Sequence, residues 1–180
     1  MYKELILAIN PGSTSTKVAL YDGNEKLFVK NIKHQVEELK KFEHIADQYE
    51  FRKDICLKEI KDAGYDIKDV KVVIGRGGLI KPITSGVWGV NEQMIHDLMI
   101  GYSGEHACNL GGLIANEIAK EIGVKAIIAD PVMVDEMDDL ARISGSPLMP
   151  RQSIFHCLNQ KAIARKYAKD TNKQFRKAKC

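Results

Sequence analysis

The stretch LILAINPGSTSTKVALY near the N-terminus constrains the fold most, because it joins two apolar segments through a loop of Pro, Gly, Ser and Thr. Residues 4–10 and 15–21 have the composition of strands, and an Asp-Gly-Asn turn leads into a third strand over residues 26–32. Strands joined by tight turns pair with their neighbours. The chain is therefore predicted to begin with a three-stranded antiparallel meander.

The loop between the first two predicted strands has features of a phosphate-binding loop, but it fits neither of the two best-known kinds. A Walker A loop needs Gly directly before its Lys, and Thr16 precedes Lys17 here. A dinucleotide fingerprint needs three glycines that open a helix, whereas this loop has only Gly12 and leads into a strand. The interpretations that remain are a plain turn and a hairpin loop whose hydroxyls bind an anion. The hydroxyls concerned belong to Ser13, Thr14, Ser15 and Thr16.

Downstream of the meander, helical and strand patterns alternate, which is typical of an α/β fold. Val70 begins a short strand that is apolar at most positions, so a central place in the sheet is expected. Asn91 is expected to cap one helix and Gly123 to end another. The predicted helices span residues 42–64, 91–100, 110–122 and 154–169, and the predicted strands after the meander span residues 70–74 and 124–129. The fold predicted from these elements is a mixed sheet flanked by helices.

Composition excludes several classes of protein. The 180 residues are 44% hydrophobic and 28% charged, as in soluble globular proteins. No apolar run approaches the roughly 20 residues of a membrane helix, and no signal peptide opens the chain, so a cytoplasmic protein without a membrane partner is predicted. The four cysteines form no CxxC pair and are expected to be reduced. From Lys161 onward eight basic residues face one acid, but no nucleic-acid motif accompanies them, so no nucleic-acid partner is expected.

Polar side chains stand at the ends of three predicted strands: Asn10, Arg76 and Asp130. Ligands of open α/β sheets collect at strand ends, so these residues are candidates for one site. Glycines flank Arg76 and leave its guanidinium free to bind a carboxylate or phosphate, although an ordinary surface arginine is the alternative. Asp130 precedes a proline and is equally typical of a turn. His106 and His156 would more often be packed or capping groups, and no role is assigned to His34.

Several segments taken together resemble the butyrate kinase branch of the acetate and butyrate kinase family. They are AINPGSTSTKVALY, VIGRGGLIKP, SGEHACNLGGLIA, IADPVMVDEM and RQSIFHCLNQKA, in that order, and the resemblance extends to about Ala168. It implies an actin-like, ribonuclease H-like fold of two lobes, with nucleotide and acid meeting between them. The implied activity is phosphoryl transfer from ATP to butyrate or a branched short-chain acid, with Mg²⁺, giving acyl phosphate and ADP. A homo-oligomer is implied for the full-length protein.

The resemblance also implies roles for particular residues. The loop from Asn10 to Thr16 would face the ATP phosphates, and Asn10 would lie near Mg²⁺. Arg76 would bind the acid carboxylate and the transferring phosphoryl group, and Asp130 would act at the metal-phosphate centre. His156 would donate a hydrogen bond to the phosphoryl oxygens, and His106 would support the acid pocket.

Family members continue well beyond the end of this chain, into a Gly-rich turn that grips the nucleotide. Residues 1–150 are therefore predicted to form the N-terminal actin-like lobe, and residues 151–180 the start of a second, truncated lobe. The chain alone is expected to lack kinase activity. The alternative interpretation is a non-catalytic actin-like module that binds a nucleotide or a partner.

Overall fold

The structure, a computed structural model, describes residues 4–129, 131–154 and 157–175. It divides into two compact units. The first unit comprises Met1–Lys81 and Gly86–Pro131, and the second comprises Pro82–Ser85 and Val132–Cys180. The first unit contains the whole sheet, so it carries the strand ends on which the candidate site depends. The predicted boundary at residue 150 stays a prediction.

The sheet has six strands in the order β3-β2-β1-β4-β6-β5. β1 pairs antiparallel with β2 and parallel with β4, and β4 pairs parallel with β6. The predicted meander and the central place of the strand that begins at Val70 are both confirmed. Strand β5 was not predicted, because three residues are too few for an alternating pattern to be visible. The strands are β1 Leu5–Pro11, β2 Ser15–Asp22, β3 Glu25–Lys33, β4 Val70–Arg76, β5 Val87–Gly89 and β6 Lys125–Ala129.

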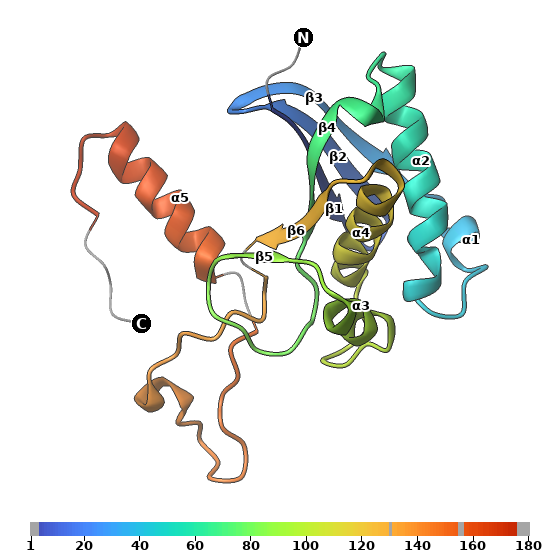
Figure 1. Ribbon diagram of the computed structural model, residues 1–180. Helices are drawn as coiled ribbons and strands as arrows, with labels where there is room; N and C mark the ends of the chain where they lie inside the picture. The colour runs from blue at the N-terminus through green and yellow to red at the C-terminus, as the bar shows by residue number, and fades with distance from the viewer. Residues whose placement is uncertain (1–3, 130, 155–156, 176–180) are drawn as a thin grey trace. The chain divides into compact units, whose positions relative to one another are not determined.

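Helices α2 (Tyr49–Asp62) and α4 (Leu110–Ile122) cover one face of this sheet (Figure 1). The core lies between the sheet and these helices. Buried and less buried residues alternate along β1, so Leu5, Leu7 and Ile9 face the helices. Helix α4 contacts β1, β4 and β6, and α2 contacts β2. The opposite positions of β1, including Asn10, therefore lie on the face that these two helices do not cover.

The shorter helices refine the sequence predictions. The helix predicted over residues 42–64 begins late: a 3-10 turn, Ala46–Gln48, precedes α2, and the Asp47 carboxylate accepts a hydrogen bond from the backbone of His44. Such a local bond favours a turn over a helix. Helix α1 (Val36–Leu39) was not predicted, whereas α3 (Glu92–Met99) was.

Both predicted helix ends are confirmed. The Asn91 side chain accepts a hydrogen bond from the Met94 backbone at 2.9 Å, as an N-cap does. Gly123 ends α4 in the left-handed conformation, with φ of 71°, which glycine adopts without strain. These caps fix where α3 begins and where α4 ends, so both of these boundaries were predicted from the sequence.

The second unit contains a 3-10 turn, Asp139–Arg142, and helix α5, Cys157–Asp170. The predicted helix over residues 154–169 is thus confirmed in its main part. Arg142 binds Asp135 through two hydrogen bonds of 2.9 and 3.0 Å. None of the helices in the described ranges has the length and apolar character needed to cross a bilayer.

Candidate active site

The parallel strands bring two predicted site residues into contact. β1 and β4 run side by side with Ile9 opposite Gly75, so the side chains that follow, Asn10 and Arg76, lie at the same edge of the sheet. Arg76 Nη1 donates a hydrogen bond of 3.2 Å to Asn10 Oδ1. An exposed amide and a half-buried guanidinium therefore form the centre of the candidate site.

A pocket of about 320 Å³ opens beside this pair on the sheet face that α2 and α4 leave uncovered. Its polar lining comprises Asn10, Arg76 and Lys17, and its apolar lining includes Ile74 and Tyr21. Lys17 was not predicted as a site residue. The signal was nonetheless present, because cross-strand partners share a face and Lys17 pairs with Asn10 in the hairpin.

The glycines around Arg76 allow a close approach between β4 and the start of α4. A Cβ on Gly75 would lie 2.1 Å from the carbonyl oxygen of Gly111, and a Cβ on Gly111 would lie 2.3 Å from the carbonyl oxygen of Arg76. Atoms cannot approach so closely, so only glycine fits at either position. The glycines that flank Arg76 thus do more than leave its guanidinium unobstructed. Gly75 and Gly111 let α4 pack directly on the strand that carries Arg76.

The hairpin loop presents some of its hydroxyls and buries another. Ser13 and Thr14 are exposed, whereas Thr16 is fully buried. The Thr16 hydroxyl lies 2.8 Å from Nε2 of His34 and accepts a hydrogen bond from Arg52 at 3.2 Å. The prediction that Thr16 offers its hydroxyl to an anion is therefore corrected, because internal partners occupy that hydroxyl. Gly12 has room for a Cβ, whose closest contact would be 3.5 Å.

Arg52 is the residue behind the loop that sequence reasoning missed. Its side chain is only 1% exposed and comes from the first turn of α2. Its position could have been noticed, since Arg52, Cys56 and Ile60 recur at the four-residue spacing of a buried helix face. A charged residue in such a series requires compensating partners.

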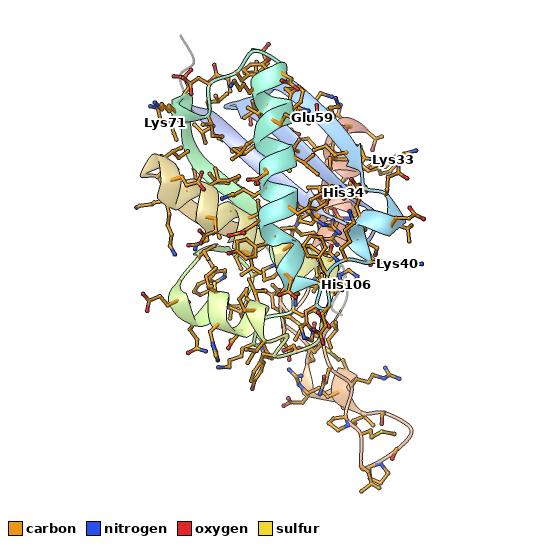
Figure 2. All side chains as sticks on the ribbon, turned by 90° about the vertical axis from the view of Figure 1, so that its right-hand side faces the viewer. Lys33, His34, Lys40, Glu59, Lys71 and His106 are labelled. Atoms are coloured by element: carbon orange, nitrogen blue, oxygen red, sulfur yellow. The ribbon has the colours of Figure 1, made fainter. Side chains whose placement is uncertain are left out.

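His34 lies beside α2 (Figure 2), where its ring packs against Phe51 at 5.7 Å between centroids. Its Nδ1 is buried and has no hydrogen-bond partner among the residues that the structure describes. Burial, together with the positive charge of Arg52, lowers the pKa of His34, so the ring is neutral at physiological pH. No role was predicted for His34, because the residues next to it in the sequence do not indicate that its side chain is buried.

Of the two histidines that were predicted as site residues, the structure describes only His106. His106 caps a 3-10 turn, Ala107–Asn109, with its Nδ1 accepting a hydrogen bond from the Cys108 backbone at 3.1 Å. Its ring is exposed and does not line the pocket at Arg76. His156 and Asp130 lie outside the described residues, although Asp130 directly follows β6, whose last residue pairs with Arg76. Their roles stay predictions.

Among the described residues, no three His, Cys, Asp or Glu side chains lie close enough together to hold a metal ion. Mg²⁺ bound with nucleotide phosphates needs only one or two protein oxygens, so a cage of carboxylates is not required. The side-chain amide oxygen of Asn10 is a hard donor at the edge of the pocket and fits that requirement.

Comparison with curated proteins confirms the resemblance noted in the sequence. The chain is 54% identical over 175 residues to butyrate kinase 1 of Clostridium acetobutylicum, covering 97% of this chain and 49% of that protein. It is 52% identical over 170 residues to butyrate kinase 2 of the same organism, covering 94% and 48%. The chain thus spans about half the length of the curated relatives it matches. No family model matches the chain.

Solved structures confirm the predicted fold. The acetate kinase of Porphyromonas gingivalis superposes with a TM-score of 0.62 at 14% identity, covering 96% of this chain and 50% of that one. A propionate kinase from Francisella tularensis gives a TM-score of 0.53 at 16% identity over the same shares. The mixed six-stranded sheet with its helices corresponds to about half of these actin-like structures.

Proposed function

We propose that this chain, a homologue of the butyrate kinases over nearly its whole length, is part of an ATP-dependent carboxylate kinase. The reaction would transfer a phosphoryl group from ATP to butyrate or a branched short-chain acid, reversibly, and give acyl phosphate and ADP. The observation that carries the proposal is the contact between Arg76 and Asn10 beside the Ser/Thr-rich hairpin loop.

Phosphoryl transfer to a carboxylate requires that both reactants are positioned and that their negative charges are neutralised. A carboxylate is already a nucleophile, so no strong base is required, and the difficulty lies in bringing two anions together. Arg76 would hold the carboxylate and the equatorial oxygens of the phosphoryl group with the paired donors of its guanidinium. Lys17, in the same pocket, would add a second positive charge. Both cations would be stronger donors once the cleft excludes water.

The hairpin loop would hold the ATP phosphates through Ser13, Thr14 and Ser15, and Mg²⁺ would supply charge neutralisation between the phosphates. Asn10 would hold this ion and also orient Arg76 through their hydrogen bond. Asp130 would act at the same centre, His156 would hydrogen-bond the phosphoryl oxygens, and His106 would support the acid pocket, as the sequence resemblance implies.

The apolar part of the acid would need a small hydrophobic surface. Candidates close to Arg76 along the chain are Leu79, Ile80 and Val87. Ile80 is 2% exposed and belongs to the core. Val87 is 65% exposed and pairs with Ala129 at the strand ends beside Arg76, so it is the better candidate of these two.

We further propose a cytoplasmic, homo-oligomeric protein. Cys56 and Cys108 are free and buried, which suits a reducing compartment. Butyrate kinases of Clostridium acetobutylicum, at above 50% identity, support butyrate as the first acid to test.

The test is acyl phosphate formation, captured as hydroxamate, by the full-length protein with butyrate, ATP and Mg²⁺. Arg76→Ala is expected to lower kcat/KM for the acid by about 10² or more, as loss of oxyanion donors does. Lys71→Ala, at the other end of β4 (Figure 2), is the matched control and should leave turnover unchanged. Near-normal turnover by Arg76→Ala would remove Arg76 from the site, and no hydroxamate from any acid of two to five carbons would refute the kinase.

A further inference from the structure

Arg52 holds the hairpin loop from behind through its carbonyl groups. Its Nη1 donates to the Gly12 carbonyl at 2.7 Å and to the Ser15 carbonyl at 3.2 Å, and its Nη2 donates to the Ser13 carbonyl at 3.0 Å. A planar guanidinium presents its donors in a fixed fork, so three carbonyls bound at once define the course of the loop.

The fork is itself held in place. Gln48, one turn earlier, accepts hydrogen bonds from Arg52 Nε at 3.2 Å and from Nη2 at 2.8 Å. The Thr16 hydroxyl accepts from Nη1 and is fixed in turn by His34. Every donor nitrogen of Arg52 thus has a partner on the loop, on β2 or in the 3-10 turn that precedes α2. A side chain so constrained can act as a template for the loop.

Peptide geometry determines what this template does on the outer side of the loop. In a trans peptide the C=O and the following N–H point in opposite directions. The Gly12 and Ser13 carbonyls face Arg52, so the N–H groups of Ser13 and Thr14 face away from it. Both residues are exposed. Successive N–H groups aimed at solvent form a concave anion-binding site.

Arg52 also places a positive charge under the loop. Among the described residues, no carboxylate forms an ion pair with it, and burial lowers its pKa without removing the charge of so basic a group. Neutral acceptors solvate the guanidinium: backbone carbonyls of the loop, the Gln48 amide and the Thr16 hydroxyl. An anion on the outer side of the loop would therefore meet a charge that no carboxylate of the described residues neutralises.

We propose that Arg52 is a positioning residue that shapes this loop into the site for the terminal phosphates of ATP, by orienting the Ser13 and Thr14 amides and by its buried charge. The proposal rests on the proposed function for the identity of the anion. It assigns the phosphate affinity of the loop to a side chain of α2, about 40 residues along the chain from the loop it shapes.

Two substitutions separate geometry from charge. Arg52→Lys keeps the charge and loses the fork, and Arg52→Gln loses both. Lys53→Gln is the matched control on the same helix, because Lys53 forms its ion pair with Glu121 of α4 and not with the loop. Binding is measured on the 180-residue chain by following backbone amide resonances while inorganic triphosphate, and separately ATP, is added.

In the wild-type chain and in Lys53→Gln, the Ser13 and Thr14 amides should shift with triphosphate. Arg52→Lys should weaken triphosphate binding by about tenfold, the loss expected when charged hydrogen bonds are misplaced, and Arg52→Gln should weaken it further. In the full-length protein, Arg52→Lys should raise KM for ATP while KM for the acid stays unchanged, a split that general loss of stability would not produce. Where Arg52→Lys does not fold, Gln48→Leu, which only releases the guanidinium, should show the same split to a smaller extent.

A folded Arg52→Lys chain that binds triphosphate as tightly as wild type would overturn the proposal, and so would a wild-type chain whose Ser13 and Thr14 amides do not respond. A full-length protein that binds triphosphate through these amides but forms no acyl phosphate would refute the proposed kinase activity and leave the role of Arg52 standing.

Discussion

Replacing Gly75 by Ala should disturb the site more than adding a methyl group at any other glycine near it. The new Cβ would lie 2.1 Å from the carbonyl oxygen of Gly111 and 2.9 Å from the backbone nitrogen of Gly112. Real Cβ contacts essentially never fall below 3.0 Å, so β4 and α4 would have to separate by about 0.9 Å. Both contacts are with backbone, so no side chain can rotate to relieve them. Overpacking of this kind costs about 1–3 kcal/mol.

The same movement would displace Arg76, the next residue on β4. A shift of about 1 Å in a positioned group can cost about 10² in rate, so acid phosphorylation by the full-length protein should fall by that order. Stability is measured by urea unfolding of the chain and turnover by hydroxamate formation. Gly89→Ala is the control, because nothing lies within 4 Å of the Cβ it would add. A Gly75→Ala protein with stability within about 0.5 kcal/mol of wild type and normal turnover would refute the reasoning.

Three further outcomes are expected. Thr16→Val should cost about 1–3 kcal/mol in urea unfolding, because His34 and Arg52 would lose a buried partner; an unchanged midpoint would contradict this. Burial raises the pKa of the Cys56 thiol from 9.0 to about 12, so the folded state holds a proton that the unfolded state loses, and stability should fall as pH rises from about 9 toward 12. Unfolding midpoints of wild type and Cys56→Ala between pH 7 and 11 check this, and parallel curves would count against it. Preference among acids should be graded, since each methylene in an apolar pocket is worth about 1–3 kcal/mol; equal kcat/KM for acetate and butyrate would contradict a butyrate-type pocket.

The sequence predicted those parts of the fold that depend on local signals. The turn residues set the meander, Asn91 and Gly123 set the helix ends, and the apolar composition of the strand at Val70 placed it centrally. These features depend on backbone conformation and on how many faces of an element are buried, and both leave a pattern in neighbouring residues. The rule that ligands of α/β sheets collect at strand ends also made Asn10 and Arg76 candidates for one site, and their side chains are in contact.

Other features that depend on long-range contacts were not predicted. The roles of Arg52 and His34 depend on their contacts at the loop, and neither residue lies near that loop along the chain. Thr16 was assigned to the anion because its hydroxyl belongs to the same Ser/Thr run, whereas strand alternation turns it toward the core. The contact between Gly75 and Gly111 involves backbone atoms of two elements, which residue types alone do not reveal.

A double-mutant cycle on Asn10 and Arg76 tests the central claim most directly, since the two side chains are claimed to act as one unit on the transferring phosphoryl group. The measurement is kcat/KM for butyrate in the full-length protein and in Asn10→Ala, Arg76→Ala and the double variant. Because Asn10 orients Arg76 through their 3.2 Å hydrogen bond, the loss of activity in the double variant should be smaller than the product of the two single losses. A double variant whose loss equals the product of the two single losses would contradict the account.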